Sequence, residues 1–472
     1  MLRTKVVCTL GPATSSPEAI RALVRGGMDL ARVNMSHGGH DAHATAIEAV
    51  RTAAREAGRP VAVLADLAGP KIRVGTLAAP IELEVGTIVV VAPEGNVRPG
   101  EIPTTYVPLA EEIREGDAVL MDDGLLELRC VGVAGDRTRL EVVRGGTLKS
   151  RKGINLPTVD VKAPSLTEKD LLDLAFALEH QVEYIGLSFV RRPEDVIDLK
   201  ARIGKRALVV AKIEKVQALR TIEEVMAETD AVMVARGDLG VELPFERVPL
   251  AQKRIIQLAN FYGRPVITAT QMLESMIEHP RPTRAEASDV ANAILDGTDA
   301  VMLSGETAAG AYPMEALEAL VRIGREIEGS GFLERGPRYL TRPGPRSRRG
   351  ATPREHAVAA ATVESARQVG APAIIVITRS GFSARLVSSY RPSVPIFAVT
   401  TDALTYRQLA AVWGVHPEHA QAAEVTYESL TTFGRERVLA SGVGERGAAI
   451  VVTAGYPFHE AGATNTMRIE LL

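Results

Sequence analysis

The chain has 472 residues, of which 46% are hydrophobic and 24% are charged, and its net charge is −3 at pH 7. A chain of this length exceeds one ordinary hydrophobic core and predicts two to four domains. The composition is typical of a soluble globular protein, and the small net charge gives no electrostatic argument for nucleic acid or membranes as partners.

Two absences in the sequence narrow the class of protein further. No apolar run approaches the length that spans a membrane, and the first residues hold no apolar leader, so we expect a cytoplasmic protein. Cys8 and Cys130 are far apart and lie near no histidine cluster. We therefore expect two buried, inert thiols rather than a disulfide or a zinc site.

Residues 1–335 alternate short apolar runs with amphipathic stretches, which is the pattern of βα units around a parallel sheet. Helix starts are indicated at Ser16-Pro17, with proline at the first helical position, and at residues 165–168 (SLTE), which resemble a capping box. Eight strands, each followed by a helix, predict an α/β fold, the (β/α)8 TIM barrel. The predicted strands span residues 6–10, 30–34, 61–66, 184–188, 208–214, 231–235, 265–268 and 300–303.

One connection in the predicted barrel is different from the others. The segment after the third strand lacks a convincing long helix and instead predicts strands at 88–92, 118–121, 125–131 and 139–143, separated by glycine-containing turns. We therefore predict a small β-barrel domain at residues 70–164, inserted between barrel parts 1–69 and 165–335. At this position it would stand over the C-terminal mouth of the barrel as a lid.

The chain beyond the barrel predicts a linker and a third domain. Residues 336–353 are dense in proline, glycine and arginine, which favours a linker. A basic arm for nucleic acid is the weaker alternative, because the run is short and Tyr339 is its only aromatic residue. A helix at 356–369 and strands at 374–378, 396–400 and 449–453 predict an α/β domain over 354–472. No repeat of 20–50 residues is visible, which excludes solenoids and propellers.

Polar residues stand at the C-terminal ends of the predicted strands, where barrels of this kind place their active sites. In the buried run 208–214, Lys212 and Glu214 point to the same side, and taken alone they fit a structural salt bridge equally well. Nearly every other strand also ends in polar residues, which favours an active site over scattered loop charges. These residues are Arg32, Asn34, Ser36, His37, Asp66, Arg236, Gly237, Asp238, Thr270, Gln271, Ser304, Gly305 and Glu306.

The residue types at these ends limit the chemistry. Glu214 and Asp238 are hard oxygen ligands from neighbouring strands, and their charge matches one Mg²⁺. Arg32, Arg73 and Lys212 supply positive charge for an anionic substrate.

A carboxylate site is also indicated. Thr270 and the amides around Gly237 can hold a carboxylate, since glycine allows close backbone approach. A metal, cations and hydrogen-bond donors without a nucleophile match phosphoryl transfer, which needs positioning and charge neutralisation.

Seven sequence blocks resemble the signatures of the pyruvate kinase family, in order along the chain. Because all seven are collinear, chance similarity is negligible, and the resemblance covers the barrel, the lid and the C-terminal domain. The blocks are KVVCTLGP (5–12), ARVNMSHG (31–38), GPKIR (69–73), AKIE (211–214), MVARGDLGVE (233–242), TATQMLESM (268–276) and MLSGETA (302–308).

The resemblance implies transfer of a phosphoryl group from phosphoenolpyruvate to ADP, giving pyruvate and ATP. It implies a homotetramer that uses Mg²⁺, with Mn²⁺ as the alternative metal, bound by Glu214 and Asp238. Lys212 would stabilise the transferring group and Arg32 would contact the substrate phosphate. The other implied roles are carboxylate binding for Gly237, Asp238 and Thr270, nucleotide binding for Asn34, His37, Arg73 and Lys152, and a protonating water chain ordered by Ser304 and Glu306.

The sequence departs from the family pattern where many members bind K⁺. The matching positions here are Asn34, Ser36, Asp66 and the carbonyl of Leu67. Those members carry glutamate within the Gly-Pro-X-Ile-Arg block, where this chain has Lys71. We expect the Lys71 ammonium to replace the charge of K⁺, so that K⁺ is not required. The alternative is that Lys71 faces solvent and K⁺ still binds.

The C-terminal domain resembles the allosteric domain of the family. A loop that follows a predicted strand and opens a helix forms a phosphate-binding geometry. Loop 455–462 lacks the basic residues that bind the second phosphate of fructose 1,6-bisphosphate in some members. We therefore expect a monophosphate effector, AMP or a sugar monophosphate, unless the loop is a relic. The effector residues would be Thr378, Arg379, Ser380, Gly381 and Ser383.

Two other functions would explain part of the sequence. A metal-dependent barrel lyase or aldolase acting on phosphoenolpyruvate-like acids would explain Lys212, Glu214 and Asp238. It would not explain the lid with Lys152 or the seven blocks. A catalytically inactive sugar-phosphate sensor is disfavoured because every matched catalytic position is intact.

Overall fold

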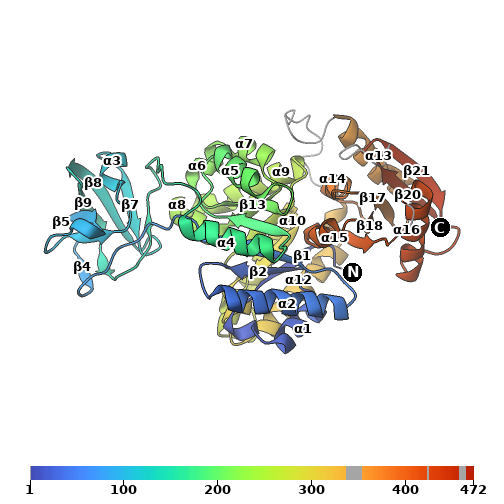
Figure 1. Ribbon diagram of the computed structural model, residues 1–472, viewed down its shortest axis with the longest axis horizontal. Helices are drawn as coiled ribbons and strands as arrows, with labels where there is room; N and C mark the ends of the chain where they lie inside the picture. Colours follow the sequence, from blue (N-terminus) through green and yellow to red (C-terminus); the bar gives the residue numbers. More distant parts are fainter. Residues whose placement is uncertain (1, 336–352, 422–424, 456–463) are drawn as a thin grey trace.

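The computed structural model describes residues 2–335, 353–421, 425–455 and 464–472. An all-β region, a central barrel and a C-terminal α/β region follow one another along the long axis of the molecule (Figure 1). Within the described ranges, no helix is long and apolar enough to cross a membrane. Residues 336–352 of the predicted linker and 456–462 of the predicted last loop lie outside those ranges.

The predicted TIM barrel is confirmed. Eight parallel strands close in the order β1-β16-β15-β14-β13-β12-β3-β2. Each strand lies within one residue of its predicted bounds, because each is a fully or mostly buried apolar run. The strands are β1 (Lys5–Thr9), β2 (Leu30–Asn34), β3 (Ala62–Asp66), β12 (Tyr184–Leu187), β13 (Leu208–Ile213), β14 (Ala231–Ala235), β15 (Val266–Ala269) and β16 (Ala300–Leu303).

The barrel helices begin where side chains can satisfy their first amides. Ser16 caps the first of them by accepting a hydrogen bond from the Ala19 amide at 3.1 Å. The start predicted at residues 165–168 is two residues too early, because Thr167 is the cap and Asp170 completes the capping box. The helices are α1 (Pro17–Gly26), α2 (His40–Glu56), α4 (Glu168–Glu179), α5 (Pro193–Ile203), α6 (Val216–Arg220), α7 (Ile222–Glu228), α8 (Arg236–Glu242), α9 (Val248–Phe261), α10 (Arg284–Asp296), α11 (Gly305–Ala308) and α12 (Pro313–Gly329).

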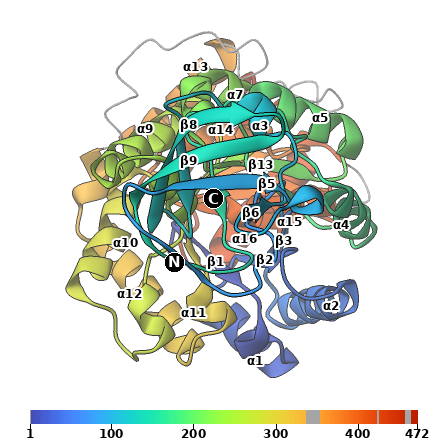
Figure 2. The same ribbon diagram turned by 90° about the vertical axis from the view of Figure 1, so that its left-hand side faces the viewer.

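The inserted segment between β3 and α4 has its own hydrophobic core and covers one end of the barrel (Figure 2). We call it the lid. Its two ends pair with each other through a bridge between Arg73 and Gly153. Its strands form a six-stranded sheet and a two-stranded sheet. The lid contains β4 (Ile81–Leu83), β5 (Ile88–Pro93), β6 (Ile102–Thr104), α3 (Leu109–Glu112), β7 (Ala118–Met121), β8 (Leu126–Ala134), β9 (Arg137–Arg144), β10 (Gly146–Leu148) and β11 (Ile154–Asn155).

The C-terminal domain is built on one five-stranded sheet in the order β19-β18-β17-β20-β21. The three predicted strands are present, and two more lie at the sheet edges, where their exposed residues gave no apolar run. The elements are α13 (Pro353–Gln368), β17 (Ile374–Ile377), α14 (Phe382–Ser389), β18 (Ile396–Thr400), α15 (Ala403–Gln408), β19 (Val415–His419), α16 (Tyr427–Ala440), β20 (Ala449–Ala454) and β21 (Thr466–Leu471).

This domain packs against the N-terminal strand ends of the barrel, opposite the lid (Figure 1). At the start of β12, Glu183 pairs with Arg407, and the Tyr184 hydroxyl donates to the Gln408 carbonyl at 2.6 Å. The lid therefore stands alone over the C-terminal strand ends, where the predicted site residues lie.

His416, on β19, makes this interface sensitive to acid. Burial, followed by the charge of Lys5, lowers the pKa of His416 to about 3. The unfolded chain takes up this proton below pH 6.5 and the folded chain does not, so stability is present above pH 6.5 and is lost as the pH falls toward 3.

We predict that lowering the pH from 6.5 to 5 costs the wild-type protein about 2 kcal/mol more in free energy of unfolding than it costs the His416→Phe variant. Phenylalanine keeps a ring beside Phe397, whose centroid lies 5.7 Å from that of His416, but cannot titrate. Urea unfolding at both pH values measures the difference. An equal loss of free energy of unfolding in the two proteins between pH 6.5 and pH 5 would contradict the prediction.

Candidate active site

Lys212 lies at the centre of the polar strand ends. Its Nζ is 2.9 Å from Glu214 Oε1 and 3.2 Å from Asp66 Oδ1, and it donates to Ser188 Oγ at 2.8 Å. Burial alone would lower the pKa of Lys212, but Asp66 and then Glu214 outweigh it, and the pKa is raised. The ammonium therefore stays charged although only 12% of the side chain is exposed.

Asp66 joins this lysine to an arginine. Arg32 Nε donates to Asp66 Oδ2 at 2.7 Å, and Arg32 Nη1 donates to Thr9 Oγ1 at 3.1 Å. Burial acts to raise the pKa of Asp66, but the charges of Lys212 and Arg32 outweigh burial and lower it. Gly186 on β12 leaves room for this carboxylate, since a Cβ there would lie 2.8 Å from Asp66 Oδ1. Two cations are thus fixed by one buried anion.

Glu214 and Asp238 have the chemistry of a magnesium site. Glu214 is 1% exposed, and its Oε2 accepts from the Phe189 amide at 2.8 Å. Burial raises the pKa of Glu214, Lys212 lowers it, Asp238 raises it, and the net shift is upward. In the described part of the chain, no group of three or more His, Cys, Asp or Glu could hold a metal. Two carboxylates fit Mg²⁺, which takes few protein oxygens and completes its shell with water and phosphate.

Thr270 is held in a left-handed backbone conformation, with φ of 65°, which is unfavourable for a β-branched residue. Arg236 maintains it by donating to the Thr270 carbonyl at 2.5 Å. The Thr270 hydroxyl accepts from the Gly237 amide at 2.8 Å. The loop after β15 and the start of α8 are therefore held together, and the Thr270 hydroxyl also donates to the Ala269 carbonyl at 2.7 Å.

Ser304 and Glu306, after β16, differ in what they can contact. Glu306 is 2% exposed, and its two oxygens accept from the amides of Ser304 at 2.7 Å and Leu273 at 3.1 Å. The Ser304 hydroxyl is buried and has no hydrogen-bond partner among the described residues. Glu306 thus orders the loop, and Ser304 keeps a hydroxyl available for a water molecule or a substrate.

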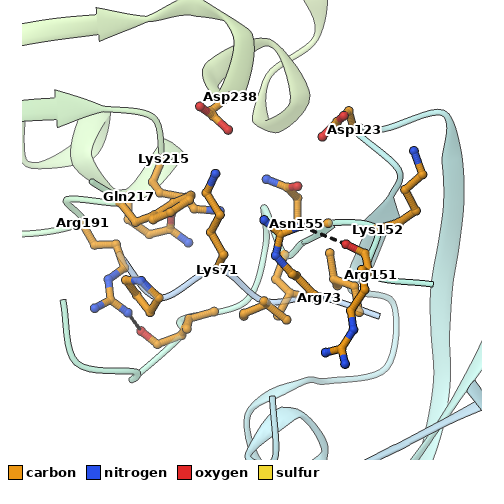
Figure 3. A pocket seen from close by; sticks show the side chains of 17 residues that line it. Lys71, Arg73, Asp123, Arg151, Lys152, Asn155, Arg191, Lys215, Gln217 and Asp238 are labelled. Atoms are coloured by element: carbon orange, nitrogen blue, oxygen red, sulfur yellow. Dashed lines mark hydrogen bonds between the residues drawn. The ribbon is translucent and has the colours of Figure 1, made fainter. Parts of the chain in front are cut away.

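A cavity of about 350 Å³ lies between the lid and the barrel mouth (Figure 3). Lys71 points toward the part of it where Asp238 lies. Arg73 Nη1 donates to the Arg151 carbonyl at 2.9 Å, and Lys152 pairs with Asp122 at 2.7 Å. The positive lining favours an anion such as a polyphosphate. The cations that line the cavity are Lys71, Arg73, Arg151, Lys152, Arg191 and Lys215.

The predicted nucleotide residues are only partly brought together. Arg73 and Lys152 line the cavity, whereas Asn34 and His37 do not. Asn34 belongs to the end of β2, where its Oδ1 accepts from the Ser36 amide at 3.1 Å.

The predicted effector loop lies in the C-terminal domain, before α14. The Thr405 hydroxyl donates to the Arg379 carbonyl at 2.9 Å, and the hydroxyls of Ser383 and Thr464 are 2.6 Å apart. Gly381 has φ of 75°, which requires glycine. Thr378 and Ser380 complete the loop.

Sequence reasoning missed four residues that contact the site. Ser188 could have been found, because it ended the fourth predicted strand at the same level as the other site residues. Asn155, Lys215 and Glu242 gave no local signal, since their mutual contacts link segments far apart in the chain.

Comparison with known proteins identifies relatives over the whole chain. Family models described as pyruvate kinase, barrel domain, and pyruvate kinase, alpha/beta domain, match residues 1–317 and 356–470. Pyruvate kinase of Sporosarcina psychrophila is 41% identical over 482 residues, covering 100% of this chain and 81% of the relative. That of Geobacillus stearothermophilus is 42% identical over 478 residues, covering 100% and 80%. A crystal structure of a pyruvate kinase from Cryptosporidium parvum has a TM-score of 0.91 at 34% identity, covering 100% of this chain and 96% of that one.

Proposed function

The chain belongs to the pyruvate kinase family of phosphotransferases, and from this premise we propose how its residues transfer a phosphoryl group from phosphoenolpyruvate to ADP. One observation carries the assignment of roles. Lys212 stays charged between Asp66 and Glu214 at the barrel mouth, next to a cationic cavity under the lid. A migrating phosphoryl group needs such a fixed positive charge in its path.

The barrel mouth binds the donor substrate. Arg32 holds the phosphate of phosphoenolpyruvate, and Lys212 neutralises charge on the phosphoryl group as it moves. The Thr270 hydroxyl and the backbone of Gly237 and Asp238 hold the substrate carboxylate and fix its orientation.

The lid and the metal site bind ADP, the acceptor of the phosphoryl group. Arg73 and Lys152 bind the phosphates of ADP, and the lid excludes water that would otherwise hydrolyse the phosphoryl group. Mg²⁺, or Mn²⁺ in its place, would be held by Glu214 and Asp238 and would supply positive charge to offset the charge of the phosphates. The Ser304 hydroxyl orders the water that protonates the enolate, with Glu306 holding the loop.

Asn34 and His37 would complete the nucleotide site from the end of β2. We place the enzyme in the cytoplasm as a homotetramer.

We predict that the protein forms ATP from phosphoenolpyruvate and ADP when Mg²⁺ is present and that Lys212→Met lowers kcat by about 10³-fold, as expected when a fixed charge on the transition state is lost. The matched control is Lys253→Met, which removes an exposed ion pair with Asp296 on the outside of the barrel.

A coupled assay for ATP measures both variants. Consumption of phosphoenolpyruvate without ATP formation would favour a lyase or aldolase, and no turnover would favour a sensor. A Lys212→Met variant within tenfold of the wild type would contradict the role of Lys212.

Three of the four K⁺ ligands implied by the resemblance already contact other groups of the protein, which supports independence from K⁺. Asn34 Oδ1 accepts from the Ser36 amide at 3.1 Å, and the Leu67 carbonyl accepts from Ser188 Oγ at 2.7 Å. Asp66 is paired with two cations. We propose that a monovalent cation is not needed here because Lys71 supplies its charge.

At constant ionic strength, activity with Mg²⁺ alone is expected to lie within twofold of activity with added K⁺. Lys71→Glu removes the ammonium and adds an anion, so this variant is expected to gain at least tenfold activation by K⁺. Steady-state rates in K⁺ and in tetramethylammonium salts measure both effects. A hundredfold activation of the wild type by K⁺ would exclude this part of the proposal.

For the effector loop we propose binding of AMP or a sugar monophosphate by Thr378, Arg379, Ser380, Gly381 and Ser383. The position of the loop at the start of α14 supports this, because free amides at helix starts favour phosphate.

AMP or a sugar monophosphate is expected to lower KM for phosphoenolpyruvate, and Ser380→Asp to remove this response by placing a carboxylate against the phosphate. Saturation curves with each effector measure it. An unchanged response in Ser380→Asp would contradict the site, and no response in the wild type would leave the loop without an effector.

A further inference from the structure

Glu242 is a buried carboxylate that joins the lid to the barrel and has no part in the chemistry described above. It is the last residue of α8 and is 5% exposed. Its Oε1 accepts from Lys215 Nζ at 2.6 Å and from Asn155 Nδ2 at 3.1 Å. Asn155 belongs to lid strand β11, and Lys215 directly follows Glu214 in the sequence. The side chains of Asn155 and Lys215 both line the cavity (Figure 3).

The carboxylate compensates the charge of Lys215 close to the proposed metal site. The Lys215 ammonium lies 5.4 Å from the ring centre of Phe189, and the Phe189 amide donates to Glu214. With only 16% of the Lys215 side chain exposed, solvent screens its charge weakly. Without Glu242 this cation would raise the positive potential at Glu214 and oppose a divalent cation.

Glu242 also lies on the same face of α8 as Asp238, one helical turn away. The lid reaches this helix at a second point, since a Cβ on Gly124 would lie 3.5 Å from Val241 Cγ1. Another contact between barrel and lid does not involve α8, since Gln217 of α6 donates to the Val159 carbonyl at 2.9 Å.

We propose that Glu242 is a positioning residue that serves two steps of the proposed reaction through one oxygen. It holds the Lys215 charge away from Glu214, so that the divalent cation can bind, and it docks the lid over ADP by accepting from Asn155. The inference rests on the proposed function, because it assigns the metal to Glu214 and Asp238 and the nucleotide to the lid.

The first test measures Mn²⁺ binding to the nucleotide-free enzyme from the EPR signal of free Mn²⁺, which requires no turnover. Glu242→Gln keeps the shape and the acceptor for Asn155 but leaves Lys215 uncompensated. It is expected to weaken Mn²⁺ binding about tenfold. Adding Lys215→Met removes the excess charge and is expected to return the Kd to within twofold of the wild type.

The matched control is Glu183→Gln, which removes a buried, paired carboxylate at the opposite end of the barrel. It is expected to leave the Kd of Mn²⁺ unchanged. A purely structural role for Glu242 predicts no rescue by Lys215→Met. The proposal is therefore overturned if Glu242→Gln binds Mn²⁺ normally or if the double variant stays weak.

The second test separates lid docking from metal binding. Asn155→Ala is expected to raise KM for ADP about tenfold, the loss of one hydrogen bond to a charged group, while changing kcat and the Kd of Mn²⁺ by less than twofold. The control Asn96→Ala removes a hydrogen bond to Asp136 within the lid. It is expected to leave KM for ADP, kcat and the Kd of Mn²⁺ unchanged.

An unchanged KM for ADP in Asn155→Ala would overturn the docking role. Failure of the proposed function is distinguishable from failure of this inference. If the proposed function is wrong, the wild type forms no ATP, while the Mn²⁺ measurements still report whether Glu242 controls the charge of Lys215.

Discussion

The buried carboxylate of Asp66 is the interaction on which the rest of the site depends. Arg32 and Lys212 both pair with Asp66, and without this anion between them two like charges would face each other at the barrel mouth, which is strongly unfavourable. Strand register supplies this anion, since Asn34 pairs with Asp66 across β2 and β3 and Gly186 pairs with it from β12. Closing the barrel and assembling the site are therefore the same event.

The two sides of the mouth contribute differently. Barrel side chains are mostly buried, paired and limited to one arrangement by the strands. Lys152, on the lid, is more exposed, and its partner Asp122 belongs to the lid as well. Paired, buried side chains at the barrel mouth thus face more exposed side chains on the lid, which suits the proposed roles of the mouth in phosphoryl transfer and of the lid in nucleotide binding.

Sequence reasoning found the elements whose signal is local. Each barrel strand is an apolar run bounded by polar residues, so its bounds were predictable to one residue. The edge strand β19 was missed because Pro417 and partly buried polar residues interrupt any apolar pattern. Among the site residues, Lys212 and Asp66 are marked by their position at strand ends. Asn155 and Glu242 are 87 residues apart along the chain, and only the folded chain brings the two together.

The position of the lid within the chain has a consequence for folding. Strands β3 and β12 are neighbours in the barrel, with Leu64 opposite Tyr184, although about 120 residues separate them along the chain. Because the lid has its own core and pairs its own ends at Arg73 and Gly153, a lid that forms first brings the two strands close. The folded lid then replaces a long flexible loop between β3 and β12, so the entropy cost of pairing these two strands is smaller.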